Sequence, residues 1–414
     1  MTKEKSTVPR LRFPGFTDAW KQRKLGEVSK RVTRRNKELI SSLPLTISAQ
    51  HGLVDQEEFF NKQVASKDVS SYYLIKKGEF AYNKSYSNGY PWGAIKRLDR
   101  YEMGVLSTLY IVFKPTSLIC SDYLVSYYDT VNWYKEVSMI AAEGARNHGL
   151  LNIAPNDFFK TRLFIPTLPE QEAIGNFFSD LDQLITLHQR KLDDVKELKK
   201  ALLQKMFPKG NGNDFPELRF PEFTDAWKQR KLGEVAEKIS QKNLDRQYVE
   251  TFTNSAEFGI ISQRDFFEKN ISSLDNISGY YIVSPDDFVY NPRISNLAPV
   301  GPIKRNKLGR VGVMSPLYTI FRFSDIHLDF VEKYFDTTIW HRYMELNGDS
   351  GARSDRFAIK DSVFKGLPIP LPTLPEQEAI GSFFSDLDQL ITLHQRQLDH
   401  LKLLKKALLQ QMFI

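Results

Sequence analysis

Hydrophobic residues recur every three to four positions along two long stretches of the chain. One stripe runs from Ile174 to Met206, and the other runs from Ile380 to Met412. Each follows a Thr-Leu-Pro-Glu-Gln segment, in which proline suits the first helical position and glutamate favours the positive end of the helix dipole. The pattern predicts two helices of roughly 37 residues, each about 55 Å long, whose matching stripes favour mutual burial in a coiled coil.

The segments ahead of the two stripes carry shorter patterns of both kinds. Aromatic and aliphatic runs bounded by Gly, Pro, Asn and Ser predict strands at Tyr72–Ile75, Tyr110–Phe113 and Tyr280–Val283. Spacing of three to four positions predicts helices at Asp122–Met139 and Asp329–Met344. The sequence therefore predicts two mixed α/β heads in tandem, each followed by a long helix.

The chain of 414 residues contains one unit twice. Pro9–Val28 returns as Pro216–Val235 with 18 of 20 positions identical, and Ile165–Phe207 returns as Leu371–Phe413 with 36 of 43 identical. The segments between these anchors still align but have diverged. We expect a first head at residues 1–165, a helix at 166–208, a linker at 209–215, a second head at 216–371 and a second helix at 372–414.

Composition narrows the class of protein further. The net charge of +7 and the pI near 9.1 favour a polyanionic partner such as nucleic acid. Cys120 is the sole cysteine, which excludes an internal disulfide and a multi-cysteine zinc site. The first ten residues have no apolar core of a signal peptide, and no run of roughly 18 apolar residues occurs, so we expect a cytoplasmic protein.

The sequence carries no motif of an enzyme. Glycine-rich phosphate loops are absent, and so is the Asn/Asp-Pro-Pro-Tyr/Phe motif with which amino-methyltransferases hold a flipped adenine. Tyr290–Arg293 comes near that motif but lacks its second proline and aromatic residue, which favours a turn. His188 and His394 have no further ligand types at metal spacing, so we expect register positions in the helices. We therefore predict a chain with no catalytic residue, metal or cofactor of its own.

Basic and aromatic residues gather in equivalent loops of the two heads. Lys and Arg neutralise phosphates, whereas Asn, Arg and aromatic residues can reach base edges. Pairs that both copies share, Lys96-Arg97 and Lys304-Arg305, suit phosphate contacts, so we expect Arg305→Ala to weaken binding to every duplex. Positions that differ suit base readout, so we expect Arg356→Ala to relax discrimination at one base pair.

The predicted DNA-binding residues of the first head are Gln50, His51, Lys84, Tyr86, Asn88, Tyr90, Trp92, Lys96, Arg97, Arg146, Asn147 and His148. Those of the second head are Asn254, Glu257, Phe258, Arg293, Asn296, Lys304, Arg305, Lys307, Arg310, Arg353, Ser354 and Arg356.

The two long helices are nearly identical even at positions off the hydrophobic stripe. If only the core mattered, exposed positions could have diverged as the heads did, so we infer two equivalent docking surfaces for two copies of one partner. Recombination between the helix segments is a rival explanation, which the mass of the complex would distinguish. The predicted partner-binding residues are Pro169, Glu170, Gln171, Asp182, Gln183, Pro375, Glu376, Gln377, Asp388 and Gln389.

Three doubled motifs carry a resemblance to a known family. They are Pro166–Glu172 with its copy Pro372–Glu378, Trp20 and Lys24–Glu27 with their copies Trp227 and Lys231–Glu234, and a Gly-Ala-Arg triplet ahead of each helix. In this order the chain resembles, over essentially its whole length, the specificity subunit of type I restriction-modification enzymes, which serve in bacterial defence.

The resemblance implies two target-recognition domains at opposite ends of an antiparallel coiled coil. Each domain would bind one half of a bipartite double-stranded DNA site, and the helices would set the number of unread base pairs between the halves. It also implies two adenine-methylating subunits that use S-adenosylmethionine, together with restriction subunits that use ATP and Mg²⁺. Catalysis would belong to those partners.

Three other functions stay open at this point. A stand-alone bipartite DNA-binding regulator would share every DNA-facing feature but would lack methylating partners. A self-contained restriction-modification fusion enzyme would bind S-adenosylmethionine itself. A coiled-coil scaffold whose heads bind protein would show no salt-dependent affinity for DNA.

Overall fold

The computed structural model describes residues 7–48, 51–86, 89–141, 149, 151–209, 214–266, 276–349 and 355–414. The chain forms two compact units. Unit 1 comprises Met1–Gln189 and Arg396–Ile414, and unit 2 comprises Arg190–Gln395. The end of the second long helix therefore belongs with the first head, and the end of the first long helix belongs with the second head.

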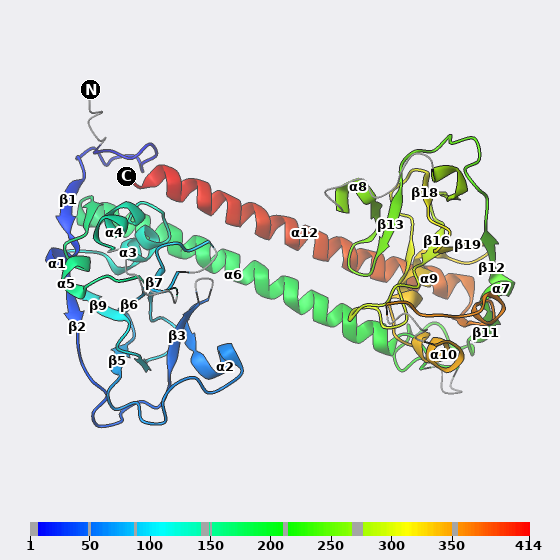
Figure 1. Cartoon of the computed structure of the whole chain (residues 1–414), viewed down its shortest axis with the longest axis horizontal. Coiled ribbons are helices and arrows are strands. Elements are labelled where there is room, and N and C mark those ends of the chain that lie inside the picture. Colours follow the sequence, from blue (N-terminus) through cyan, green and yellow to red (C-terminus); the bar gives the residue numbers. More distant parts are fainter. Residues whose placement is uncertain are drawn as a thin grey trace. The chain divides into compact units, whose positions relative to one another are not determined.

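The first head is a mixed α/β domain (Figure 1). Its strands are β1 (Lys21–Lys24), β2 (Ser29–Val32), β3 (Leu45–Ser48), β4 (Gly52–Asp55), β5 (Tyr73–Lys76), β6 (Phe80–Asn83), β7 (Ala94–Arg97), β8 (Met103–Leu106), β9 (Ile111–Pro115) and β10 (Arg162–Ile165). Its helices are α1 (Leu25–Val28), α2 (Gln56–Phe60), α3 (Ser121–Tyr128), α4 (Tyr134–Ile140) and α5 (Pro155–Phe158). An antiparallel four-stranded sheet has the order β2-β9-β6-β7, and the pairs β1-β10, β3-β4 and β5-β8 complete the head.

The second head repeats this connectivity strand for strand. Its strands are β11 (Lys228–Lys231), β12 (Ala236–Ile239), β13 (Phe252–Ser255), β14 (Gly259–Ser262), β15 (Tyr281–Val283), β16 (Phe288–Tyr290), β17 (Ile303–Arg305), β18 (Gly312–Met314), β19 (Thr319–Phe323) and β20 (Pro368–Leu371). Its helices are α7 (Leu232–Val235), α8 (Gln263–Phe266), the 3-10 turn η1 (Ile277–Gly279), α9 (Leu328–Phe335), α10 (His341–Asn347) and α11 (Asp361–Phe364). The sheet order is β12-β19-β16-β17, with the pairs β11-β20, β13-β14 and β15-β18.

The strands predicted at Tyr72–Ile75, Tyr110–Phe113 and Tyr280–Val283 are confirmed as β5, β9 and β15, each beginning one residue later. The single helices predicted over Asp122–Met139 and Asp329–Met344 are wrong, because each is divided in two. The hydroxyl of Thr130 donates to the Tyr127 carbonyl at 2.7 Å, and the Trp133 indole donates to the Tyr128 carbonyl at 3.1 Å. These side chains occupy carbonyls that another helical turn would need, so α3 ends there. Thr337 and Trp340 end α9 in the same way.

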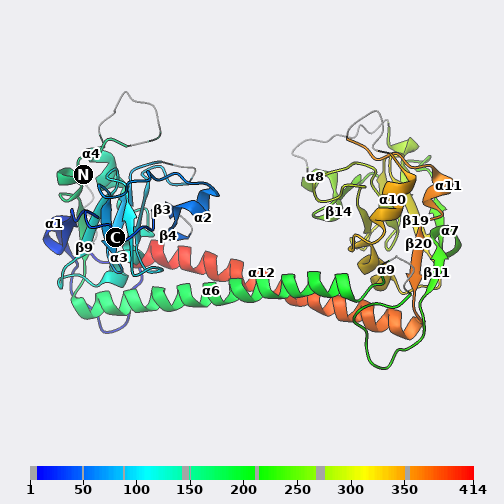
Figure 2. The ribbon, with the colours of Figure 1, turned by 90° about the horizontal axis from the view of Figure 1, so that it is seen from below.

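The two long helices are confirmed as α6 (Leu168–Lys205, 38 residues) and α12 (Leu374–Met412, 39 residues). In unit 1 the end of α12 lies beside the beginning of α6 (Figures 1 and 2). The ring of Phe413, just beyond α12, lies 5.3 Å from that of Tyr123 in the core of the first head. In unit 2 the ring of Phe207, just beyond α6, lies 5.4 Å from that of Phe330. Each helix thus ends in the core of the other copy's head.

A segment ahead of each head holds these helix ends. In unit 1 it is residues 9–20, where the Leu11 amide donates to the Gln411 carbonyl at 3.0 Å. In unit 2 it is residues 216–227, where the Leu218 amide donates to the Lys205 carbonyl at 2.9 Å. Carbonyls in the last turn of a helix have no partner within the helix, so these bonds satisfy groups that would otherwise be left open.

No helix in the described part of the chain is long and apolar enough to cross a lipid bilayer.

Candidate nucleic-acid interface

Three loops of the first head converge at β7, the edge strand of the four-stranded sheet. The Tyr86 amide in the β6–β7 loop donates to the Gly149 carbonyl at 2.8 Å, and the Leu151 amide donates to the Lys84 carbonyl at 2.9 Å. Strands β3 and β4 contact β7, which brings the β3–β4 hairpin to the same place. The topology therefore gathers segments that lie far apart in the sequence.

The second head builds the same frame from different residues. The Ile294 amide donates to the Asp355 carbonyl at 3.1 Å, and the Phe357 amide donates to the Pro292 carbonyl at 2.8 Å. The equivalence of these bonds pairs Gly149 with Asp355 in the two copies. An alignment through the Gly-Ala-Arg triplets would instead pair Gly149 with Arg356, which is wrong by one residue because the second copy is one residue shorter between the triplet and this bond.

A glycine closes the neck of each loop. Gly93 has φ +76° and Gly301 has φ +83°, a backbone region that side chains rarely adopt. A Cβ atom at either position would lie 2.1 Å from the carbonyl oxygen of Asn83 or Asn291. The two chain segments can approach this closely only where no side chain intervenes, so both heads keep the same neck beneath loops that otherwise differ.

Ten of the predicted DNA-binding residues lie on these loops with exposed or half-buried side chains. Exposed side chains are those of His51, Tyr86, Glu257, Phe258, Arg293 and Asn296, and half-buried ones are those of Lys84, Tyr90, Trp92 and Arg356. Burial lowers the pKa of Lys84 below its ordinary value. Gln50, Asn88, Arg146, Asn147, His148, Arg353 and Ser354 lie outside the described residues.

The shared Lys-Arg pairs are held by carboxylates within their own heads. Lys96 Nζ lies 2.7 Å from Asp129, and Arg97 lies 2.6 Å from Asp99 and 2.7 Å from Asp122. In the second head, Lys304 lies 2.8 Å from Asp336. These bonds tie the sheet to α3 and α9, so the cations predicted to contact phosphates already have carboxylate partners within their own heads.

Arg305 is the most enclosed of these cations. Its guanidinium lies 2.7 Å from Asp286, 2.6 Å from Asp329 and 3.4 Å from Glu332, with only 14% of the side chain exposed. Burial alone would lower its pKa, but the facing carboxylates hold the pKa above its ordinary value. A phosphate at this position would have to compete with carboxylates that are already bound.

Three further candidates of the second head also have internal partners. Lys307 lies 3.1 Å from Glu332, and Arg310 lies 2.8 Å from Glu250, although both cations are exposed and such surface pairs exchange readily. Asn254 is buried, and its amide nitrogen donates to the Val289 carbonyl at 2.7 Å. Asn254 therefore supports the loops from beneath, and its assignment to base contact is corrected.

The Pro-Glu-Gln turn at the start of each long helix is an internal fastening. Glu170 is fully buried and accepts two bonds from Arg12, at 2.6 and 2.7 Å, while Gln171 accepts from the Cys120 amide at 2.9 Å. Glu376 with Arg219 and Gln377 with His327 repeat the arrangement. Glu170, Gln171, Glu376 and Gln377 are therefore wrongly assigned to a partner surface, whereas Pro169 and Pro375 are exposed.

Asp182 and Asp388 anchor the incoming helix ends. In unit 1, Lys405 of α12 lies 2.7 Å from Asp182 of α6 and 2.8 Å from Asp129 of the head. In unit 2, Lys199 of α6 lies 2.5 Å from Asp388 of α12. Burial would raise the pKa of Asp129, but Lys96 and Lys405 hold it below its ordinary value. The sequence could not reveal these bonds, because their partners lie in different copies of the repeat.

A small apolar surface on each long helix was not predicted from the sequence. Leu184 and Leu187 are 40% and 48% exposed, and their copies Leu390 and Leu393 are 37% and 52% exposed. Leu184 and Leu390 directly follow Gln183 and Gln389, two exposed residues of the predicted partner-binding set. The near identity of the two helices at exposed positions could have indicated this surface. Hydrophobic spacing alone could not, because it assigns every leucine of the stripe to a core.

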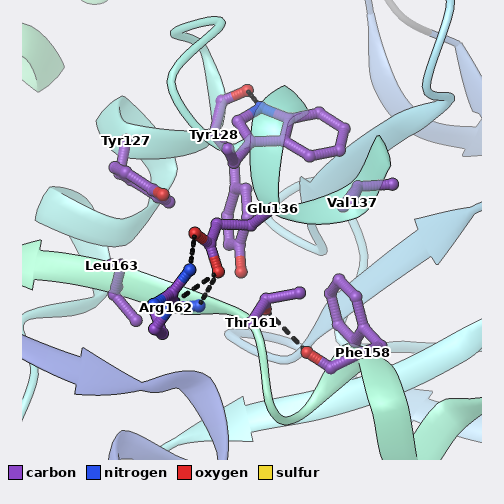
Figure 3. Close-up of a pocket in the computed structure, with 9 residues that line it drawn as sticks. Tyr127, Tyr128, Glu136, Val137, Phe158, Thr161, Arg162 and Leu163 are labelled. Carbon is purple, nitrogen blue, oxygen red and sulfur yellow. Dashed lines mark hydrogen bonds and ion pairs between the residues drawn. The ribbon is translucent and has the colours of Figure 1, made fainter. Parts of the chain in front are cut away.

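A small hollow lined by residues of α3, α4 and β10 in the first head shows how α4 is held (Figure 3). The Glu136 carboxylate accepts bonds from the backbone and side chain of Arg162, at 2.9 to 3.0 Å, and Thr161 donates to the Phe158 carbonyl at 2.6 Å. The hollow measures about 10 Å³, which is room for about one water molecule. It is a packing feature and offers no space for a cofactor.

Among the described residues, no three side chains of His, Cys, Asp or Glu gather as metal ligands.

Known proteins share both sequence and architecture with this chain. The family model described as the type I restriction modification DNA specificity domain matches residues 224–403. Two specificity subunits from Methanocaldococcus jannaschii are similar in sequence. The type I restriction enzyme MjaVIII specificity subunit is 21% identical over 74% of this chain and 72% of its own length. The putative type I restriction enzyme MjaX specificity subunit is 26% identical over 69% of this chain and 65% of its own length.

Solved structures share the fold over almost the whole chain. The type I restriction-modification S subunit from M. genitalium is 13% identical, covers 98% of this chain and 99% of its own, and superposes with a TM-score of 0.56. A chain from a structure described as showing complex assembly and conformational transition of the type I R-M system is 18% identical, covers 95% and 97%, and has a TM-score of 0.50. The family model matches part of the second copy of the repeat, and the first copy has the same strand connectivity, so the chain is similar in sequence and in fold to type I restriction-modification specificity subunits.

Proposed function

We propose that this chain recognises a bipartite site in double-stranded DNA, one half-site per head, as the specificity and assembly subunit of a type I restriction-modification complex. The observation that carries the proposal is the pair of heads with one connectivity and one loop frame but different exposed residues on it. Exposed residues such as Tyr86 in one head and Arg293 in the other occupy this frame. Two such surfaces suit two different sequences of the same kind of ligand.

The two long helices would pair as an antiparallel coiled coil that sets the number of unread base pairs. Support comes from within each unit, where the end of one helix is bonded to the first half of the other through Lys405 and Asp182 or through Lys199 and Asp388. Heads that contact one face of the duplex would lie about one helical turn of DNA apart, or a multiple of it.

The apolar surfaces at Leu184–Leu187 and Leu390–Leu393, with Gln183 and Gln389, would bind two copies of a methyltransferase subunit. Exposed leucines beside polar residues are typical of docking sites, and the two surfaces have the same sequence. Adenine methylation with S-adenosylmethionine, and restriction with ATP and Mg²⁺, would take place in the partner subunits.

Selection of bound duplexes from a pool with a randomised central region tests the DNA-binding role. We expect sequencing of the bound fraction to show two specified segments separated by a constant number of unspecified base pairs. A single continuous motif, or none, would contradict the proposal.

The mass of the complex with the methyltransferase subunit tests the docking surfaces. We expect two partner copies on the natural chain and one copy on either the Leu187→Glu or the Leu393→Glu variant, because each removes one surface. Lys200→Ala, an exposed change on α6 outside both surfaces, is the control and should keep two copies. Stable DNA binding with no partner at all would favour a stand-alone regulator.

A further inference from the structure

The loop frame holds one pair of opposed residues in each head. In the second head, Arg293 and Arg356 form an antiparallel bridge between the β16–β17 loop and the loop after α10. The two bonds of the frame lie on either side of this pair, joining Pro292 to Phe357 and Ile294 to Asp355. In an antiparallel ladder this is the non-hydrogen-bonded type of pair, in which the Cα atoms lie about 4.5 Å apart and the side chains are closest.

Both members of this pair are cations without a counter-charge in the part of the chain that the structure describes. No carboxylate there lies within ion-pair distance of Arg293 or Arg356, whereas Lys304, Arg305, Lys307 and Arg310 each have one. Like charges directly opposite each other in a ladder are destabilising. An electron-rich group placed between the two guanidinium groups would remove that cost.

The position of the pair is firmly held. The Asn291 side-chain oxygen accepts from the Arg293 amide at 3.0 Å, and its nitrogen donates to the Asn254 carbonyl at 2.8 Å. Ser295 and Ala298 exchange backbone bonds at 3.0 and 3.1 Å, which closes the turn beyond it. The loop is therefore joined both to the β13–β14 hairpin and to the loop after α10.

The first head has the same frame with a neutral residue in place of Arg293. Its two bonds flank Ser85, and the residue between Gly149 and Leu151 in the sequence is a leucine, which lies outside the described residues. The sequence of the first head therefore has no arginine pair at the positions that correspond to Arg293 and Arg356.

We propose that Arg293 and Arg356 together form an acceptor-binding site of the second head, which holds the hydrogen-bond acceptors of duplex DNA. This inference rests on the proposed function. Arginine is suited to two kinds of acceptor on DNA, the O6 and N7 atoms of guanine and the oxygens of phosphate. The two sources differ in their effect on sequence preference and on salt dependence.

The experiment compares the full-length chain with Arg293→Ala, Arg356→Ala and the corresponding lysine variants, using the pool of randomised duplexes and titrations at several salt concentrations. Arg230→Ala is the matched control, because it removes one exposed positive charge from the same head in a different sheet. Melting temperatures of all variants check that each folds.

Two results support the site and identify its acceptor. If guanine is bound, the alanine variants lose preference for guanine at one position of one half-site by about 5- to 150-fold, the lysine variants recover it only in part, and the other half-site is unchanged. If phosphate is bound, affinity falls equally for all sequences, and the slope of log affinity against log salt falls by about 0.9 per lost contact.

The remaining results overturn it. If the natural chain selects a two-part motif and the arginine variants keep that motif, its affinity and its salt slope, the arginine site is refuted and the proposed function stands. A natural chain that binds no duplex would remove both. If the natural chain binds DNA without sequence preference, the bipartite proposal fails. In that case a shallower salt slope of the alanine variants supports the arginine site, and an unchanged slope refutes it.

Discussion

At the scale of single residues, cations that are identical in the two copies have structural partners within their own heads. Lys96 and Lys304 are the same in both heads because each bonds to an aspartate at the end of a helix, Asp129 or Asp336. A sequence shows that a cation is present but not which carboxylate the fold brings to it. Arg293 and Arg356, which have no such partner among the described residues, are therefore better DNA candidates than the shared pairs.

We predict that Arg305→Ala lowers the stability of the second head and leaves the salt dependence of DNA binding unchanged. The substitution leaves Asp286, Asp329 and Glu332 facing one another without their cation, which should cost about 2 kcal/mol in the free energy of unfolding. Urea denaturation and salt titration of DNA affinity measure the two effects. A normal denaturation midpoint together with a shallower salt slope would return Arg305 to the phosphate-binding residues.

At the scale of helices and strands, the sequence predicted the long helices and several strands because these depend on local spacing. It failed where the outcome depends on contacts across the fold. The motif Pro169-Glu170-Gln171 gives the same signal whether it is exposed or buried, and only the approach of Arg12 and Cys120 makes it an internal fastening. The loops could be located from composition, but the opposed arginines could not, because their pairing depends on which segments the topology joins.

We predict that Phe413→Ala loosens the first head and that Phe207→Ala loosens the second. Each substitution removes a buried ring from the core of the other copy's head, at a cost of about 3 to 5 kcal/mol. Hydrogen exchange should show loss of protection around Tyr123 in the first variant and around Tyr334 in the second. The two variants serve as controls for each other, and loss of protection in the head that precedes the substituted helix would contradict the interleaved arrangement.

We predict that acid releases the end of α12 from the first head. Lys96 and Lys405 lower the pKa of Asp129 in the folded state, so the bonds stabilise unit 1 fully above the ordinary aspartate pKa of about 3.9. Their contribution is lost as pH falls below that value through the lower folded pKa. The difference in stability between the natural chain and Lys405→Ala, measured from neutral pH to pH 3, should shrink over this range, and a constant difference would argue against the mechanism.

At the scale of the whole molecule, the two compact units do not coincide with the two copies of the repeat. Each unit contains residues from both, since Arg396–Ile414 belongs to unit 1 and Arg190–Lys205 to unit 2. The high identity of the anchors then has a structural reason, because each anchor must fit its counterpart from the other copy as well as its own head.

We predict that cutting the backbone between residues 209 and 214 leaves the two fragments associated. Each unit buries apolar side chains from both fragments, so either unit would lose part of its core if the fragments separated. Gel filtration of the chain with a protease site in this linker, before and after cleavage, should give the same elution volume. Separation into two half-sized species would show that the shared cores contribute little.

The position of Phe413 also affects how the chain folds while it is being made. The first head leaves the ribosome early, yet a ring in its core belongs to the second-last residue of the sequence. At 5 to 20 residues per second, the second copy of about 207 residues takes about 10 to 40 s to synthesise. Throughout that interval the aromatic residues around Trp20 and Tyr123 lack a neighbour. We therefore expect the core of the nascent first head to stay incompletely packed until Phe413 has been synthesised.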